Sequence, residues 1–506
     1  MTCRTGTALA LLLSLCVAPV ATAATAASGA TVDASSAAPT ANTAYLAEFG
    51  AALQQADRGD SLGASIVIDR LLADPRLVDI DVENRSHVWA SAAMVAGAQK
   101  QGAVALQRLQ QALAVNPRNA YARLRLAWFQ MVEQQPEAAA DSVVRAIADS
   151  DGAPDMSPQM VWQLDTQLKH QPTKRLAVLQ GLFDSEWKIE GIEPAELWVV
   201  LATLQAEAGQ GDKVAATLER IDAPIPLVRL RADKRFDPYL RRDDPRHDPV
   251  AAARRHIDQL RVDTMLAPGL NETAVELSSA LMVAGELQDV VGMTEALAVA
   301  ATEATVAPPG KGRYVAWMLD IRSRALRRLG KPDDALAAQL LALRMTDPQG
   351  DTVSQNLNLA SLYVALDRPL KAREVMQSVG EDMSAYGAST QALIELRAAL
   401  QLKDAAAAQR ARERLLANRA LTPDHYREGL LVDHRMDEAA ASLLEQLADP
   451  MERGTALFDL QDVRRAPVLP ADADLHASWE QLKQRADVQA AVNRVGRIDT
   501  YPLFAN

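Results

Sequence analysis

Apolar residues recur at helical spacing from Ala44 almost to the end of the chain. Segments such as 120–135 (AYARLRLAWFQMVEQQ) and 136–150 (PEAAADSVVRAIADS) carry apolar positions three and four residues apart. Proline, glycine and Asp-Pro pairs separate such segments. No alternation of apolar and polar residues persists, and β-branched and aromatic residues do not gather in short runs. The pattern predicts an all-α protein without a β-sheet.

Small residues recur along these helices with a common spacing. Within each set the first two positions are 12 residues apart and the next follows 7 residues later, and two neighbouring sets are offset by 34 residues (127 − 93). The sets are Ala93, Ala105 and Ala112 with Trp89 and Pro117; Ala127, Ala139 and Ala146; Ser323, Ala335 and Ala342 with Pro348; and Ala360 and Ala372. Small side chains let the two helices of a hairpin approach closely, and the proline ends the second helix. The spacing therefore predicts repeated helical hairpins.

This spacing resembles the tetratricopeptide repeat (TPR), with Trp89 and Ala93 in a first helix, Ala105 and Ala112 in a second, and Pro117 closing the unit. The clearest matches cover 85–151 and 315–380, and looser hairpins are expected at 44–75, 194–223, 270–305, 384–418 and 423–450. The resemblance implies antiparallel hairpins stacked into a right-handed superhelical solenoid. An irregular all-α bundle or a related solenoid is the alternative.

Two charged segments suggest that the array has two lobes. Residues 228–248 are proline-broken and highly charged, and residues 482–504 share their Arg-Ala-Asp opening. A solenoid must cover its last exposed face with an atypical element. We interpret both segments as closing caps, which predicts helical arrays at 44–245 and 248–506.

The N-terminal residues have the features of a secretory signal peptide. Arg4 precedes a short apolar stretch from Ala8 to Val20, and the small-x-small triplet 21–23 (ATA) follows it. Cleavage near Ala23 would leave residues 24–43, which are small and polar, as a flexible linker. We therefore expect a periplasmic or secreted bacterial protein, with a retained N-terminal anchor as the alternative.

Composition narrows the choice of chemistry. Both cysteines, Cys3 and Cys16, lie in the predicted leader, so the mature chain would hold neither a disulfide nor a thiolate metal site. The formal net charge of −12 argues against nucleic acid and anionic membranes as partners. The seven histidines are scattered without an H-E-x-x-H motif, and no phosphate loop or dinucleotide fingerprint occurs. No metal and no cofactor are expected.

Residues 59–63 (GDSLG) resemble the nucleophile block of GDSL esterases and also fit the G-x-S-x-G elbow, while Arg58-Gly59-Asp60 spells the adhesion tripeptide. A hydrolase serine of this kind stands between a strand and a helix. Here helical patterns lie on both sides, so we expect a hairpin turn at Gly59 with Asp60 or Ser61 capping the next helix. A hydrolase that uses Ser61 is kept as an alternative function.

The TPR resemblance implies that first helices line an inner groove. The residues it places there are Tyr121, Arg125, Trp128, Trp317, Arg324, Arg328, Asn358 and Ser361. Arginine suits carboxylates or backbone carbonyls, and tryptophan suits an apolar anchor. The same aromatic residues would also fit the core, and Arg324 is spaced to pair with Asp320.

From these features we expect a non-catalytic scaffold or adaptor that binds a protein or peptide partner in envelope assembly, export or quality control. Besides the hydrolase, a helical subunit of a larger envelope complex is an alternative. The identity of the partner and the oligomeric state are not predicted.

Overall fold

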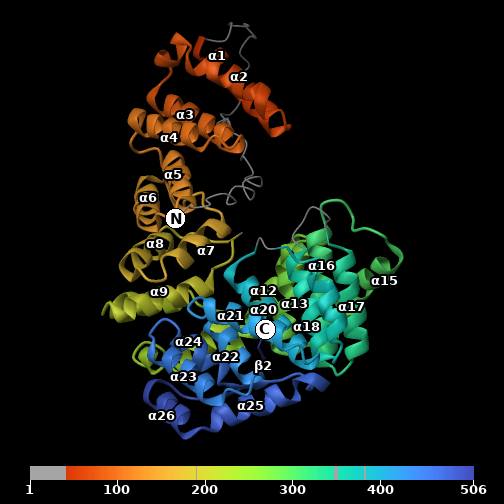
Figure 1. The fold of residues 1–506 in the computed structure, drawn as a ribbon. Coiled ribbons are helices and arrows are strands. Elements are labelled where there is room, and N and C mark those ends of the chain that lie inside the picture. The colour runs from red at the N-terminus through yellow and green to blue at the C-terminus, as the bar shows by residue number, and fades with distance from the viewer. Residues whose placement is uncertain (1–40, 190, 347–351, 381–382, 506) are drawn as a thin grey trace. The chain divides into compact units, whose positions relative to one another are not determined.

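The computed structural model describes residues 41–189, 191–346, 352–380 and 383–505 (Figure 1). It consists of two compact units, unit 1 (Met1–Pro194) and unit 2 (Ala195–Asn506). The predicted leader and most of the predicted linker lie outside the described residues. Helix α1 begins at Ala41, so the last residues assigned to that linker are helical.

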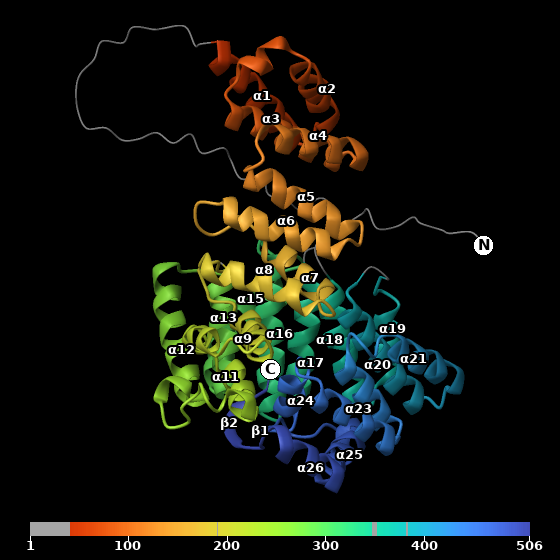
Figure 2. The ribbon, with the colours of Figure 1, turned by 90° about the vertical axis from the view of Figure 1, so that its left-hand side faces the viewer.

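Unit 1 is a row of helical hairpins (Figures 1 and 2). Helices α1 and α2, α3 and α4, and α5 and α6 pack as pairs, and α8 packs on α6. The elements are α1 (Ala41–Asp57), α2 (Ser61–Leu72), the 3₁₀ helix η1 (Pro75–Asp79), α3 (Val82–Ala98), α4 (Gly102–Val115), α5 (Ala120–Val132), α6 (Pro136–Asp149), α7 (Pro158–Gln167) and α8 (Pro172–Asp184).

The small residues of the repeat form the contacts within these hairpins. Ala93 and Ala105, which belong to α3 and α4, and Ala127 and Ala139, which belong to α5 and α6, are all fully buried. Close packing leaves no room there for a larger side chain. Prolines open α6, α7 and α8 at a position where a helix needs no backbone donor. The predicted all-α hairpin fold is confirmed, whereas the right-handed superhelix stays a prediction.

Ser61 lies at the first residue of α2, in the turn between two helices. Gly59 has a φ of +98°, and the Asp60 carboxylate accepts a hydrogen bond from the Gly63 amide at 2.9 Å. This is the capped hairpin turn that the sequence predicted. The strand that would carry a hydrolase serine is replaced by α1, so the elbow interpretation of residues 59–63 is wrong.

Unit 2 contains further hairpins, including the pairs α9–α10, α12–α13, α16–α17, α18–α19, α20–α21 and α22–α23. Its helices are α9 (Ala195–Glu207), α10 (Gly211–Glu219), α11 (Pro224–Ala232), α12 (Pro249–Leu266), α13 (Glu272–Ala284), α14 (Leu287–Met293), α15 (Glu295–Glu303), α16 (Gly312–Arg328), α17 (Pro332–Arg344), α18 (Val353–Ala365), α19 (Pro369–Met376), α20 (Ala385–Gln401), α21 (Ala405–Ala417), α22 (Pro423–Val432), α23 (Met436–Ala448), α24 (Arg453–Asp459), α25 (Ala473–Gln484) and α26 (Ala486–Val495), with 3₁₀ helices η2 (Lys234–Phe236), η3 (Pro245–His247) and η4 (Pro470–Asp472).

Two short strands also occur in unit 2, contrary to the prediction that no strand forms. Strands β1 (Asp462–Arg464) and β2 (Thr500–Phe504) pair in parallel, with Val463 opposite Tyr501. Tyr501 and Leu503 are buried while Thr500 and Pro502 are exposed, so β2 shows the alternation of a strand in only five residues. A run this short, with a proline in it, falls below what a sequence pattern can indicate.

The two segments interpreted as caps contact each other inside unit 2. Asp233 and Gly496 form an antiparallel bridge, and the Arg497 amide donates to the Ala232 carbonyl at 2.9 Å. Helix α11 also packs on α24 and α12. Residues 228–248 therefore join the end of the chain, and the division between units lies at Pro194 rather than near residue 245.

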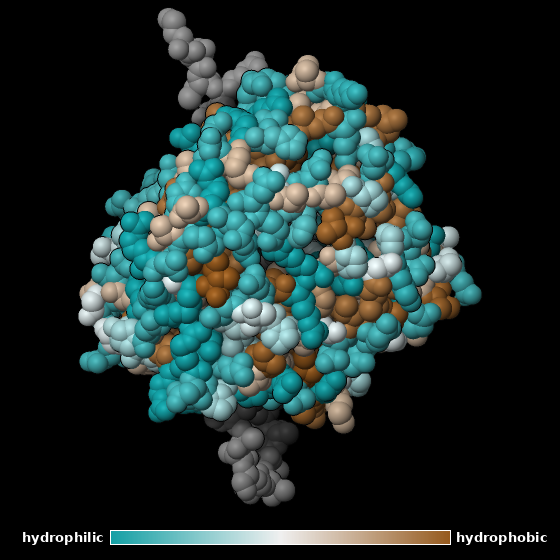
Figure 3. Space-filling view, turned by 90° about the horizontal axis from the view of Figure 1, so that it is seen from below, coloured by the Kyte–Doolittle hydropathy of each residue, from teal (hydrophilic) through white to brown (hydrophobic). Residues whose placement is uncertain are grey.

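The surface seen in Figure 3 is mostly hydrophilic, with hydrophobic residues in small separate areas. None of the described helices combines the length and the apolar character needed to cross a membrane. Exposed large apolar residues such as Leu62, Met265 and Leu370 are spread over different helices. Single exposed residues of this kind are normal on a folded protein.

Candidate functional site

The first helices of unit 1 carry large side chains at equivalent positions. Met94 in α3, Trp128 in α5 and Trp162 in α7 are 34 residues apart (128 − 94 and 162 − 128). Each directly follows a buried residue of the hairpin contact, as Trp128 follows Ala127. Met94 and Trp128 are partly buried, and Trp162 is 40% exposed. We call Met94, Trp128 and Trp162 the unit 1 ladder.

Beside the ladder lies a group of rings and one arginine. The rings of His87 (α3) and Tyr121 (α5), also 34 residues apart, have centroids 5.0 Å from each other. The Arg125 guanidinium carbon lies 4.8 Å from the centroid of the Tyr121 ring. Burial lowers the pKa of His87, with Glu83 acting in the opposite sense, which favours a neutral imidazole. The predicted residues Tyr121 and Arg125 are thus brought together.

Arg125 and Trp128 keep unused donors. Neither Arg125 Nε nor Trp128 Nε1 has an acceptor among the described residues, although both atoms are shielded from solvent. A donor in such a place costs free energy until an acceptor reaches it. These two predicted residues are therefore suited to contact an acceptor supplied from outside the chain after a small rearrangement.

Two of the predicted residues in unit 2 bind a buried carboxylate. Asp320 (α16) is fully buried, and Arg324 Nε donates to its Oδ2 at 2.8 Å. Asn358 Nδ2, from α18, donates to Asp320 Oδ1 at 2.8 Å. Because a buried carboxylate must be compensated, these donors serve the fold first. The pairing of Arg324 with Asp320 is the one that their spacing had indicated.

Arg328 holds strand β2 in place. Its Nη1 donates to the Met282 carbonyl at 3.2 Å, its Nη2 donates to the Ala505 carbonyl, and its guanidinium carbon lies 4.7 Å from the centroid of the Phe504 ring. Burial, with Arg324 and Arg327 nearby, lowers the pKa of Arg328 to about 10. The side chain predicted to meet a partner is thus occupied by the chain itself. Trp317 and Ser361 are partly buried on α16 and α18, and their binding role stays a prediction.

The last part of the chain lies against the first helices of unit 2. Strand β2 packs on α12 and α13, η4 packs on α18, and α25 packs on α22 and α23. In both ribbon views the C-terminal end lies among these helices (Figures 1 and 2). Asp472 at the end of η4 pairs with Arg327 at 3.1 Å and with Arg397. Unit 2 therefore fills much of its own inner side.

A polar cluster between α20 and α22 has the residue order of a catalytic triad but not its geometry. His425 Nε2 lies 3.0 Å from Thr390 Oγ1, and His425 Nδ1 lies 3.7 Å from Asp424 Oδ2. The second distance is too long for a hydrogen bond, and Thr390 Oγ1 also bonds its own helix at the Tyr386 carbonyl, at 3.0 Å. A triad needs an oriented base and a free nucleophile. Single Thr and His residues on separate helices gave no sequence signal for this cluster.

Glu428, on α22 near this cluster, provides a pH-dependent prediction. Burial raises the pKa of Glu428 and the Asp472 carboxylate adds to this, while Arg397 and His425 act against it. The stability that depends on the neutral carboxyl is complete below the ordinary value of 4.5 and is lost as pH rises through the raised pKa. Glu428→Gln should therefore gain stability relative to wild type as pH rises above 4.5, in urea unfolding followed by tryptophan fluorescence. A difference that shrinks with rising pH would contradict this, and Glu438→Gln at an exposed ion pair is the matched control.

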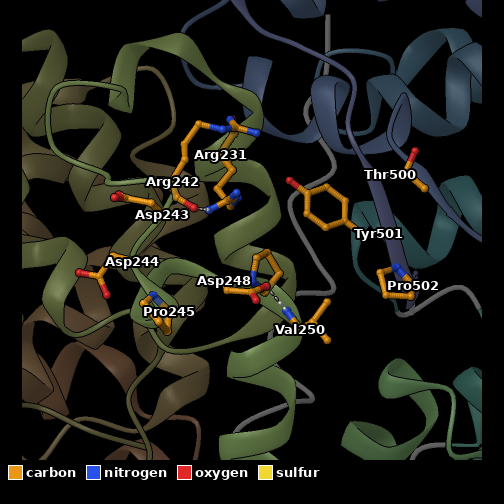
Figure 4. Close-up of a pocket in the computed structure, with 11 residues that line it drawn as sticks. Arg231, Arg242, Asp243, Asp244, Pro245, Asp248, Val250, Thr500, Tyr501 and Pro502 are labelled. Carbon is orange, nitrogen blue, oxygen red and sulfur yellow. Dashed lines mark hydrogen bonds between the residues drawn. The ribbon is translucent and has the colours of Figure 1, made fainter.

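A cavity of about 350 Å³ lies where the two Arg-Ala-Asp segments approach β2 (Figure 4). The charged side chains around it already have partners. Arg231 and Arg242 donate to each other's carbonyls at 3.1 and 3.0 Å, and Arg242 pairs with Asp499 at 2.6 Å. Burial raises the pKa of the Tyr501 hydroxyl that faces this space. The cavity thus belongs to the joint that closes unit 2. In the part of the chain that the structure describes, no group of His, Cys, Asp and Glu could hold a metal ion.

No protein-family model and no curated protein matches the chain. Among solved structures it is similar to the P58(IPK) TPR domain, at 14% identity over 80% of this chain and 100% of that one, with a TM-score of 0.20. It is also similar to the APC/C hetero-tetramer Cut9-Hcn1, at 13% identity over 90% and 96%, with a TM-score of 0.25. A circular tandem repeat protein with novel repeat topology aligns at 12% identity over 89% and 96%, with a TM-score of 0.14. At these scores the fold assignment rests on the hairpins themselves, and no function is carried over.

Proposed function

We propose that this protein is a non-catalytic scaffold or adaptor that binds a protein or peptide partner on the first helices of unit 1. The observation that carries this proposal is the unit 1 ladder. Its aromatic side chains recur at the repeat period beside Arg125 and Trp128, which have unused donors. Aromatic residues and arginine at the centre of a surface supply most of the binding energy in protein interfaces.

The proposal extends to cellular location. The signal-like residues 1–23 support export to the bacterial periplasm or to the medium, with a role in envelope assembly, export or quality control. Detection of the mature chain in the cytoplasmic fraction, with residues 1–23 still attached, would contradict export. Unit 2, whose inner side is occupied by its own C-terminal segment, would then provide the rigid body to which the binding unit is attached.

Site-specific crosslinking tests the binding surface. A photo-reactive amino acid at Trp162 should capture a partner in envelope extracts, and Trp128→Ala should reduce the yield about tenfold, as expected for a central aromatic anchor. The thermal melt should stay close to that of the wild type, because Trp128 is only partly buried.

The matched control places the same probe at Leu62, which is 70% exposed on α2. Equal capture of the same partner from both positions would contradict binding at the ladder. Capture at neither position, with turnover of a substrate by the wild type, would favour an enzyme. A large stable assembly that survives Trp128→Ala would favour a structural subunit of an envelope complex.

A further inference from the structure

Unit 1 contains a long stretch without acidic residues. Residues 84–132, which span most of α3, all of α4 and all of α5, contain no Asp or Glu, although the whole chain has 65 of them against 53 Lys and Arg. The basic residues in this stretch are Arg85, Lys100, Arg108, Arg118, Arg123 and Arg125. A local excess of one charge in a protein of opposite net charge attracts partners of complementary charge.

Several of these cations are balanced by neighbouring segments. Arg108 pairs with Asp69, while Arg118 and Arg123 lie 3.5 and 4.0 Å from Asp149. Arg125 differs from them, because no hydrogen bond or ion pair to it forms among the described residues and its one aromatic contact is the Tyr121 ring. A guanidinium supported by an aromatic ring and lacking a counter-ion is well prepared to bind a carboxylate.

The spacing of the ladder constrains the shape of what binds there. Helices α3 and α5 pack on each other, which places their axes about 8–10 Å apart. An extended chain in the polyproline II conformation brings every third side chain to the same face, with a rise of about 9 Å. Apolar side chains three residues apart would therefore match Met94 and Trp128.

We propose that the first-helix face of α3, α5 and α7 binds an acidic, extended peptide segment of a partner protein. A carboxylate of the segment contacts Arg125, and apolar side chains three residues apart contact the unit 1 ladder. This inference rests on the proposed function and adds the charge and spacing of the ligand.

Selection from a random peptide library against the full-length protein tests the charge. The wild type should select peptides with Asp or Glu next to aliphatic or aromatic residues spaced by three. Changing the selected acid to its amide should weaken binding about tenfold by fluorescence anisotropy, as should raising the salt to about 0.5 M. Arg125→Glu should shift the selected residue from acidic to basic. Arg58→Glu, an exposed position in the α1–α2 turn, should leave the selection unchanged.

The outcomes separate this inference from the proposed function. Peptides without charge preference that are lost in Trp128→Ala would keep the proposed function and overturn the acidic ligand. The same acidic peptides selected by Arg125→Glu would also overturn it. Selection of no peptide by the wild type would contradict both. Self-association of the wild type that Arg125→Glu abolishes would place a second copy of this chain on the face instead.

Discussion

Gly496→Val is expected to destabilise unit 2 by about 3 kcal/mol or more, because the two Arg-Ala-Asp segments meet at this residue. A Cβ atom on Gly496 would lie 2.5 Å from the Ala232 carbonyl oxygen and 2.6 and 2.7 Å from the two methyl groups of Leu457. Leu457 can adjust its rotamer, but the carbonyl belongs to the backbone that Arg497 bonds. Urea unfolding followed by circular dichroism measures the loss.

Gly292→Ala is the matched control in the same unit. Gly292 lies in α14 and nothing is within 4 Å of the position that its Cβ would take. Alanine there should stabilise the helix by about 0.5–1 kcal/mol, since glycine is the poorer helix former. If Gly496→Val unfolds at the wild-type urea concentration, the joint between residues 232 and 496 does not contribute to stability.

Arg427→Ala is expected to cost about 3–5 kcal/mol, the range for breaking a buried ion pair from one side. Arg427 is 3% exposed, pairs with Asp459 and donates to Gln446 Oε1. Its guanidinium carbon also lies 5.3 Å from the centroid of the Trp479 ring on α25. Removing it leaves Asp459 without its counter-ion and α25 without one of its contacts, which denaturant unfolding would detect.

The defect of Arg427→Ala should depend on pH. Burial already raises the pKa of Asp459, and Arg427 is the main group that opposes this shift. Without Arg427 the folded-state pKa rises further, so the stability present with the neutral carboxyl is lost as pH rises through that value. The defect should therefore be smaller near pH 4 than near pH 8. Arg435→Ala, which breaks an exposed pair with Glu438, should cost under about 0.5 kcal/mol, and an equal cost at both positions would refute the assignment.

The helical hairpins could be predicted because their cause is local. Ala105 and Ala139 are buried at the spacing read from the sequence, and Gly59 turns the chain where two helical patterns meet. Such positions depend on close neighbours in the chain, so periodicity reports them. The pairing of Arg324 with Asp320 was foreseen for the same reason, since one helical turn separates the two residues.

Features that depend on distant contacts could not be predicted. Strand β2 gains its structure from β1 and from Arg328, which binds the carbonyl of Ala505. The boundary at Pro194 was missed because residues 228–248 find their partners near Gly496, more than half the chain away. Nothing in the local sequence of either segment encodes that meeting. Met94 and Trp162 are different, because their 34-residue spacing from Trp128 is visible in the sequence and was overlooked.

The bridge between Asp233 and Gly496 has a consequence for how the chain matures. Hairpins of unit 1 join residues that are synthesised close together in time, so they can form as they emerge from the ribosome. Helix α11 must wait until nearly the whole polypeptide has been made before its partner exists. During that interval its apolar residues stay uncovered, and a chaperone that holds nascent unit 2 open would find its substrate there.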